Sequence, residues 1–317
     1  MPYVVWLDQG RHGRELVGGK GASLAEMIAS GFRVPDGFCV TAEAYRYFAT
    51  SNGLEDLIGP IMRRIDPLQM HSVHEAAREI SEIVSAAKLP EDLRDQIAAA
   101  YEHLAQRLGP YCAVRSSAIS EDGAGASFAG LYESYLNIQG AESVLDSVHR
   151  CFVSLWGERA VGYRARNGGG TDEAMSVVVM GLVQSDTSGI AFTAHPVTGA
   201  RDLVVINASW GLGEAVVAGM VTPDSFIVDK NTFVVLERDV FTKELQIRPH
   251  PDGRGTIEEK VPRERQGIAS LTDEQACEVA RLAAQVEQHY GSPQDIEWGL
   301  AAGELFLLQS RPITTLS

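Results

Sequence analysis

The sequence has few cysteines and no long apolar run. Its four cysteines, Cys39, Cys112, Cys151 and Cys277, are scattered among 317 residues without a CxxC pair, which argues against a zinc site or a disulfide scaffold. No segment approaches the roughly 18 apolar residues of a membrane span, and the N-terminal apolar run is too short for a signal peptide. We therefore expect a soluble protein of the reducing cytoplasm.

Positive charge is also in deficit. Lysine and arginine total 27 against 42 aspartates and glutamates, which gives a formal net charge of −15. Such a field repels phosphodiester backbones and anionic membranes, so we expect no nucleic acid and no membrane partner. A smaller anion would need a local cluster of donors, and any phosphate site must therefore be local and basic.

Apolar residues, by contrast, are plentiful. They make up 45% of the sequence against 22% charged residues, enough for one large domain or two closely joined lobes. Helical periodicity dominates the first half, whereas short runs of branched residues dominate the second. We therefore predict an α/β (α+β) fold with two lobes, residues 1–183 and 184–317, that divide near Met180 to Gly189.

The periodicity predicts particular elements. Helices are expected over residues 91–108, over 142–163, and from Thr272, where Thr272 and Gln275 have the spacing of a capping box. Strands are expected over residues 176–183, 202–207, 225–228, 232–236 and 305–308. Residues 248–265 are polar, highly charged and contain prolines, so we expect them to cross the surface between elements.

Glycines precede a predicted helix at residues 16–24 (LVGGKGASL). Backbone amides at such a helix start can face phosphate oxygens, and Lys20 adds a positive charge beside them. The GxxxxGK[ST] spacing of a Walker loop is absent, and glycine-rich helix starts are common. Taken alone, the motif favours an ordinary packed helix start.

An arginine follows an apolar strand at residues 113–118 (AVRSSA), ahead of EDG at 121–123 and SFAG at 127–130. Arg115, two hydroxyls and small residues offer a bidentate phosphate donor with close approach of the backbone. The competing interpretation is a surface salt bridge from Arg115 beside an ordinary turn. These residues alone favour neither interpretation.

Residues 207–214 (NASWGLGE) repeat the arrangement of small residues after an apolar strand. They could form a second turn that binds an anion. They could equally form a strand-to-helix connection with glycines for packing. By itself the motif favours the connection.

The most specific pattern is DIEW at 295–298 followed by LFLLQSRP at 305–312. Glu297 and Gln309 lie on two predicted strands joined by a turn at 301–303, so their oxygens could meet one hard cation. Arg311 lies two residues beyond Gln309, on the same strand face. The three side chains suit magnesium bound to nucleotide phosphates, against the alternative of a hairpin with solvated charges.

In their order along the chain, these motifs resemble one known family over nearly the whole sequence. GGKGASL, VPDGF, AVRSSA with ED and SFAG, NASWGLGE, and DIEW with LLQSRPIT are similar to the nucleotide-binding domain of phosphoenolpyruvate synthase, pyruvate phosphate dikinase and rifampicin phosphotransferase. The resemblance implies an ATP-grasp fold in which two α/β lobes hold ATP and magnesium in a cleft between them. It implies a phosphotransferase but does not fix the phosphate acceptor.

The resemblance assigns five residues to the phosphates. Lys20 and Arg115 would contact the phosphates, while Gly130 and Ser134 would belong to the loop that covers them. Arg311 would contact phosphate and stabilise the charge that spreads over its oxygens during transfer. Lys20, Arg115 and Arg311 are therefore the catalytic candidates.

The resemblance also assigns a metal site and a base-binding segment. Glu297 and Gln309 would hold magnesium. The segment around Met180 would line the adenine, but the family usually carries glutamine and a basic residue where this chain has Met180-Gly181. Backbone hydrogen bonds could still bind the base, so this departure concerns nucleotide preference and affinity.

In this family, phosphate from ATP passes to a histidine on a mobile domain and then to pyruvate or another small-molecule acceptor bound elsewhere. None of the eight histidines has the TxGGxxSH-like context of that carrier. His195, in FTAHP, is better interpreted as a neutral structural histidine. We therefore expect a phosphohistidine carrier domain or protein as partner, with this chain an excised piece, a separate subunit, or a short enzyme acting directly on a small molecule.

Other functions compete with this one. A non-catalytic regulatory module would bind ATP, close, and be recognised by a partner protein, and the Met180-Gly181 departure supports it. The complete set of phosphate and metal residues favours catalysis, including the possibility of a stand-alone kinase of the antibiotic type. ATP-dependent carboxylate ligation shares the fold, but the RSSA and QSRP motifs indicate the phosphotransferase branch.

Overall fold

The computed structural model describes residues 2–119, 133–167 and 173–314. The chain forms two compact units, Met1–Ala29 with Asp36–Gly181 and Ser30–Pro35 with Leu182–Ser317. Each unit has its own antiparallel sheet and its own helices. The mixed α/β class expected from the sequence is confirmed.

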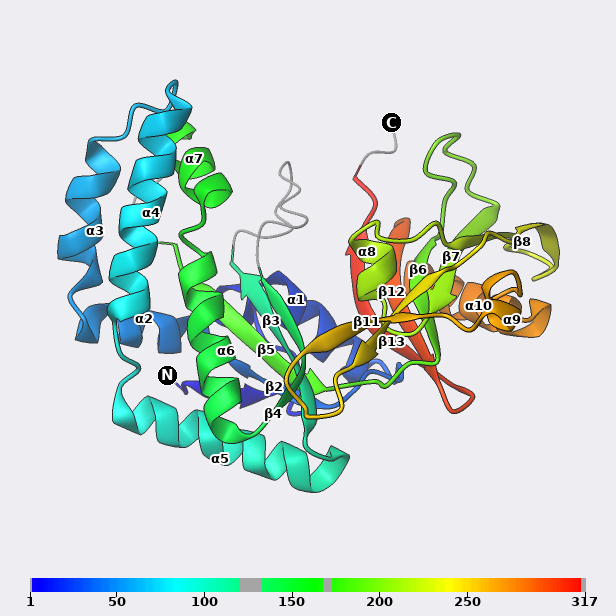
Figure 1. Cartoon of the computed structure of the whole chain (residues 1–317), viewed down its shortest axis with the longest axis horizontal. Helices are drawn as coiled ribbons and strands as arrows, with labels where there is room; N and C mark the ends of the chain where they lie inside the picture. The colour runs from blue at the N-terminus through cyan, green and yellow to red at the C-terminus, as the bar shows by residue number, and fades with distance from the viewer. Residues whose placement is uncertain (1, 120–132, 168–172, 315–317) are drawn as a thin grey trace. The chain divides into compact units, whose positions relative to one another are not determined.

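The first unit is built on a five-stranded sheet in the order β1-β2-β5-β3-β4 (Figure 1). All neighbouring strands in it run antiparallel. The strands are β1 (Val4–Trp6), β2 (Gly37–Val40), β3 (Tyr111–Ala118), β4 (Ser134–Gln139) and β5 (Met175–Gly181). The central strand β5 is buried along its whole length, as its run of branched residues predicts.

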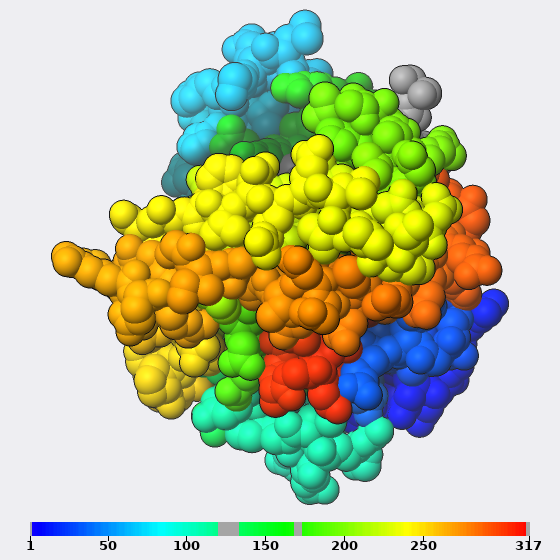
Figure 2. All heavy atoms as spheres, turned by 90° about the vertical axis from the view of Figure 1, so that its right-hand side faces the viewer, coloured from blue at the N-terminus to red at the C-terminus, as the bar shows by residue number. Residues whose placement is uncertain are grey.

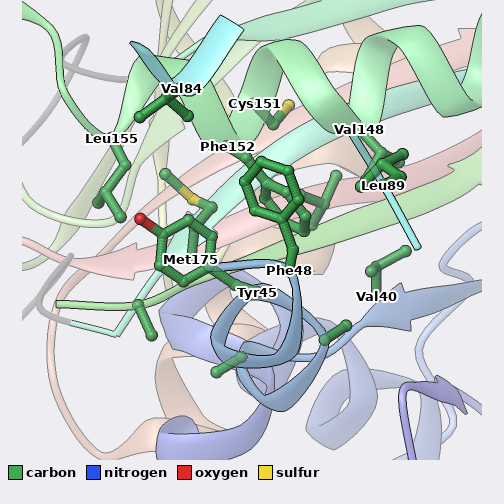
Figure 3. Close-up of a cluster of buried hydrophobic side chains, with 14 of the residues drawn as sticks. Val40, Tyr45, Phe48, Val84, Leu89, Val148, Cys151, Phe152, Leu155 and Met175 are labelled. Atoms are coloured by element: carbon green, nitrogen blue, oxygen red, sulfur yellow. The ribbon is translucent and has the colours of Figure 1, made fainter. Parts of the chain in front are cut away.

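Helices α2 to α7 pack with one face of this sheet into a single apolar cluster. They are α2 (Ala42–Ser51), α3 (Leu54–Arg63), α4 (Met70–Ala86), α5 (Glu91–Leu108), α6 (Ala141–Ser154) and α7 (Glu158–Arg166). Three rings from α2 and α6 lie together in this cluster (Figure 3): the Phe152 centroid is 5.1 Å from that of Tyr45 and 5.4 Å from that of Phe48. Burial of such large apolar side chains provides most of the driving force for this unit.

The other face of the sheet is covered by α1 (Arg14–Ala29), which packs on β3 and β5. The helix is kinked at Gly18, whose φ is 68°, a value that glycine adopts without steric cost. A Cβ at Gly18 would lie 2.0 Å from the Ser117 carbonyl oxygen. Gly18 thus divides α1 into two helical segments and precedes the second, as predicted, and the absence of a Cβ lets α1 approach β3 closely.

The second unit is built on a six-stranded antiparallel sheet in the order β13-β12-β6-β7-β8-β9. Its strands are β6 (Thr187–Phe192), β7 (Leu203–Trp210), β8 (Asp224–Asp229), β9 (Val235–Asp239), β12 (Gln294–Ala301) and β13 (Glu304–Pro312). The unit also contains α8 (Glu214–Val217), α9 (Arg263–Gln266) and the hairpin of β10 (Leu245–Pro249) and β11 (Thr256–Lys260).

Helix α10 (Asp273–Tyr290) packs across this sheet (Figure 1). The predicted capping box is confirmed: Gln275 N donates to Thr272 Oγ1 at 3.2 Å, and Thr272 N donates to Gln275 Oε1 at 2.9 Å. The two bonds satisfy backbone groups that a helix start leaves unpaired. They fix the position of the first turn against the sheet.

Strand β9 forms one edge of this sheet. Figure 2 shows the face of this unit on which the residues from β8 to α10 are exposed; they are coloured from yellow to orange. Glu237, Arg238 and Asp239 are exposed on the edge strand, and Arg238 pairs with Asp273 of α10 at 3.0 Å. Charges on an edge strand oppose pairing with another chain.

Three predicted elements differ from the structure. The single helix over 142–163 is wrong: α6 ends at Ser154 and α7 begins at Glu158, because Gly157 is extended and buried Trp156 donates from Nε1 to Tyr45 Oη at 2.9 Å. The strand over 232–236 is displaced to β9, because Thr232 is held in a turn by Asp229.

The third difference concerns residues 248–265. They do not simply connect elements, because they contribute to the β10–β11 hairpin and α9. This hairpin is anchored by a bridge between Gly211 and Ile247 and by the buried side chains of Ile247 and Val261.

Within the described ranges, no helix is long and apolar enough to span a membrane.

Candidate functional site

Three predicted phosphate-binding residues of the first unit come together in the structure. Arg115 of β3 lies directly opposite Ser134, the first residue of β4, and directly opposed residues of antiparallel strands are neighbours on one face. Lys20 of α1 donates from Nζ to the Ser116 carbonyl oxygen at 3.1 Å. Two separate sequence motifs, on α1 and β3, therefore meet in this unit.

The packing of α1 on β3 explains this arrangement. Ser117 Oγ donates to the Val17 carbonyl at 2.8 Å and accepts from Gly21 N at 3.1 Å, which ties the turn before Lys20 to the strand. Ser116 donates from N and Oγ to the Glu133 carbonyl at 3.1 and 2.8 Å. These bonds fix the chain that enters β4 beside Arg115.

The structure does not test the predictions for Gly130 and Met180. Gly130 and the predicted phosphate-covering loop lie outside the described residues. Met180 lies in β5 with a side chain that is only 2% exposed, opposite Gly37 on one side and Ala113 on the other. Its predicted contact with adenine stays a prediction.

In the second unit, Glu297 and Gln309 lie on two adjacent strands, as predicted. They lie directly opposite each other on β12 and β13, and two residues along, Asp295 lies opposite Arg311. The period of a strand puts all four side chains on one face of the sheet. A carboxylate, an amide oxygen and an arginine thus meet there, as the spacing predicts.

Asp295 is a site residue that the sequence analysis did not single out. Arg311 donates to Asp295 Oδ2 from Nε at 2.8 Å and from Nη2 at 2.6 Å. Two donors on one carboxylate hold the plane of the guanidinium. The signal was present in DIEW, because a residue two before Glu297 must share its face.

The carboxyl group of Asp295 is nearly buried, with 7% of the residue exposed. Burial raises its pKa above the usual value, Arg311 opposes this increase, and the negative charge of Glu297 adds to it. Burial of the ionised Asp295 carboxylate therefore lowers the stability of the folded state. In return, this carboxylate orients the guanidinium of Arg311.

This electrostatic cost gives a prediction for Asp295→Asn. The raised pKa means that the folded state binds the proton more tightly than the unfolded state, so the stability contributed by Asp295 is largest at low pH and is lost as pH rises through the folded pKa. The free energy of unfolding of the wild type minus that of Asp295→Asn should therefore fall as the pH rises above about 4. Urea unfolding at several pH values measures it, and a difference that grows with pH would contradict the assignment.

The Glu297 and Gln309 pair has the chemistry that magnesium requires. Mg²⁺ prefers hard oxygen ligands and is usually bound through one or two carboxylates together with substrate phosphates. Among residues 2–119, 133–167 and 173–314, no group of three His, Cys, Asp or Glu side chains could hold a metal ion. Glu297 and Gln309 would supply two oxygen ligands, and phosphate oxygens would supply others.

The register of the sheet brings the third sequence motif onto the same face. Asn207 of β7 pairs with Ile190 of β6, which pairs with Glu297 of β12. The complete cross-strand row is Gln309, Glu297, Ile190, Asn207, Ser225 and Asp239. The motif was expected to follow a strand, but its first four residues, 207–210, are the end of β7, and only residues 211–213 form the favoured connection to the short helix α8.

His195 and two buried cysteines have structural surroundings. His195 Nδ1 accepts from the backbone N–H groups of Val197 and Thr198, both at 3.2 Å, which favours the predicted structural role. Burial raises the pKa of Cys39 and of Cys112 to about 12, so these thiols stay protonated and weakly nucleophilic.

Comparison with known proteins agrees with the motifs. The family described as pyruvate phosphate dikinase, AMP/ATP-binding domain, matches residues 14–317. The phosphoenolpyruvate synthase of Pyrococcus furiosus is 41% identical over 361 aligned residues, which cover 99% of this chain and 44% of that protein. The probable phosphoenolpyruvate synthase of Methanothermobacter thermautotrophicus is 41% identical over 319 residues, which cover 99% of this chain and 46% of that protein.

A further relative and a solved structure give the range of similarity. The phosphoenolpyruvate synthase of Aeropyrum pernix is 39% identical over 349 residues, 99% of this chain and 42% of that protein, so the chain spans less than half the length of these relatives. D-alanyl-alanine synthetase A of Vibrio cholerae matches 70% of this chain and 46% of its own at 12% identity, with a TM-score of 0.28, too slight a likeness to carry an argument. By its family match, the chain belongs to the pyruvate phosphate dikinase AMP/ATP-binding domain family.

Proposed function

We propose that this chain binds Mg²⁺–ATP and passes a phosphoryl or pyrophosphoryl group to a histidine on a separate carrier domain or protein. The observation that carries the proposal is the set of two opposed pairs, Glu297 with Gln309 and Asp295 with Arg311. It combines ligands for a hard cation with an oriented arginine for phosphate oxygens. Because relatives are named phosphoenolpyruvate synthase, pyruvate is the first acceptor to test. The proposed enzyme has an ATP-grasp fold and acts in the cytoplasm.

The chain's own residues divide the work of binding. Glu297 and Gln309 hold the magnesium ion, which neutralises phosphate charge when bound. Lys20 and Arg115 bind phosphate oxygens, with Ser134 and the loop containing Gly130 covering them, and the segment at Met180 lines the base. Arg311, oriented by Asp295, stabilises charge that develops on the transferred group.

The product identifies which group is transferred. Attack of an imidazole nitrogen on the β-phosphorus forms an N–P bond, breaks the bond from that phosphorus to the oxygen it shares with the α-phosphate, and releases AMP. Attack on the γ-phosphorus releases ADP instead. A phosphoenolpyruvate synthase-like reaction is expected to give AMP.

Calorimetric titration of Mg²⁺–ATP into the chain tests the proposal. We expect saturable binding by the wild type, lost when the magnesium is chelated and weakened at least about tenfold in Glu297→Ala, because a ligand of the metal is removed. Glu304→Ala is the matched control, since Glu304 lies on the same hairpin but pairs with Arg33. It should bind like the wild type.

Product analysis completes this test. A carrier domain with the histidine motif, taken from a full-length relative, is added to the ATP-bound chain, and AMP, ADP, pyrophosphohistidine and phosphohistidine are measured. AMP formed together with pyrophosphohistidine, or ADP formed together with phosphohistidine, supports the proposal. A folded wild-type chain that does not bind Mg²⁺–ATP would refute it.

A further inference from the structure

Asn207 is a polar residue that the fold does not explain. It lies in the middle of β7, between Ile206 and Ala208, which are both completely buried. Asparagine is depleted in strand interiors because it fits the pleated surface poorly and competes for backbone hydrogen bonds. A local residue choice that opposes the fold is most often found at a functional site.

The side chain of Asn207 is half-buried and forms no hydrogen bond with any residue in the described parts of the chain. Because its neighbours along β7 face the core, the amide lies on the other face of the sheet. This is the face that carries Glu297, Gln309, Asp295 and Arg311. The amide is therefore on the same side as the metal and phosphate candidates.

The register also sets the separation. One strand, β6, lies between β12 and β7, so the Glu297 and Asn207 backbones are about 10 Å apart. Ile190 occupies the position between them and offers no polar atom. A ligand that reaches from Glu297 to Asn207 must therefore pass over the apolar side chain of Ile190 and contact polar groups only at its two ends. An extended polyphosphate is long enough to span this separation.

We propose that Asn207 is a phosphate-binding residue: its Nδ2 donates to a phosphate oxygen of the nucleotide whose magnesium is held at the Glu297–Gln309 end of the row. The inference rests on the proposed function and extends it, since it gives the direction in which the polyphosphate lies. An amide donates without adding charge. Because an asparagine amide also carries an oxygen that could bind the magnesium ion, the test must separate donation by Nδ2 from metal binding by Oδ1.

Two variants of Asn207 separate a donor from a metal ligand. In calorimetric titrations with Mg²⁺–ATP, Asn207→Ala should weaken binding about tenfold, because a hydrogen bond to a charged group is lost. Asn207→Asp should weaken binding further, because a carboxylate cannot donate and repels phosphate. Asn231→Ala is the control, since Asn231 lies in the turn between β8 and β9, where it bonds through its backbone to Asp229, and it should bind like the wild type.

The outcomes are distinct. Thermal melting first establishes that each variant is folded. If the wild type binds, Glu297→Ala loses binding, and Asn207→Ala stays within about twofold of the wild type, this inference is overturned while the proposed function stands. If Asn207→Asp binds as tightly as the wild type or tighter, the residue is a metal ligand and the donor role is overturned. A folded wild type that does not bind Mg²⁺–ATP overturns both.

Discussion

Lys243→Met is expected to lower the free energy of unfolding by about 3–5 kcal/mol, the usual cost of removing one partner from a buried ion pair. Both Lys243 and Asp224 are completely buried, and Nζ lies 2.5 Å from Asp224 Oδ1. Without the ammonium, the carboxylate stays in a low-dielectric interior with no opposite charge. Urea unfolding followed by circular dichroism measures the loss.

Two further variants sharpen this prediction. Arg238→Met removes an exposed pair with Asp273 and should cost less than about 1 kcal/mol. The double variant Asp224→Asn with Lys243→Met should cost less than the sum of the two single changes, because it leaves no unpaired charge. If Lys243→Met were as stable as the wild type, the pair would have no structural importance.

The pair matters because Asp224 joins segments distant in the sequence. Its Oδ1 accepts from Phe241 N at 3.0 Å, and its Oδ2 accepts from Ser270 N and Ser270 Oγ, both at 2.7 Å. Ser270 lies just before the cap of α10, and Asp224 precedes Ser225 of the cross-strand row. The network therefore connects the segment before α10 to β8, the strand that carries Ser225 of the row.

The sequence predicted those elements whose signals are local. The periodicity of residues 91–108 and the capping box at Thr272 each depend on groups within one or two turns, and both are confirmed. The pairing of Glu297 with Gln309 was also predictable, because a short turn fixes the register of a hairpin. The ion pair between Arg311 and Asp295 follows from the same register, so it could also have been predicted from the sequence.

Features that depend on distant contacts could not be predicted in this way. The break before α7 combines a local signal, the extended Gly157, with a distant contact, the bond from Trp156 to Tyr45 on another helix, and only the first could be read from the nearby sequence. The contact of Lys20 with Ser116 requires α1 to pack on β3. The position of Asn207 depends on the order of strands β12, β6 and β7, which one sequence does not specify.

Arg311→Ala is expected to weaken Mg²⁺–ATP binding by about 100-fold, since charge-assisted bonds from a guanidinium to phosphate are among the stronger polar contacts, about 1.5–3 kcal/mol each. Arg311→Lys should recover little of this affinity. Lysine supplies a point charge, whereas Asp295 holds the plane of a guanidinium through Nε and Nη2. Calorimetric titration of both variants measures the effect.

Arg33→Ala separates the role of Arg311 from a general effect of charge. Arg33 also lies in the second unit, but it pairs with Glu304 at the turn end of the β12–β13 hairpin. Because it lies away from Glu297 and Gln309 along the strands, its loss should leave affinity unchanged. If Arg311→Lys bound as tightly as the wild type, the orientation given by Asp295 would be irrelevant to phosphate. If Arg33→Ala weakened binding equally, only the net charge of the unit would matter.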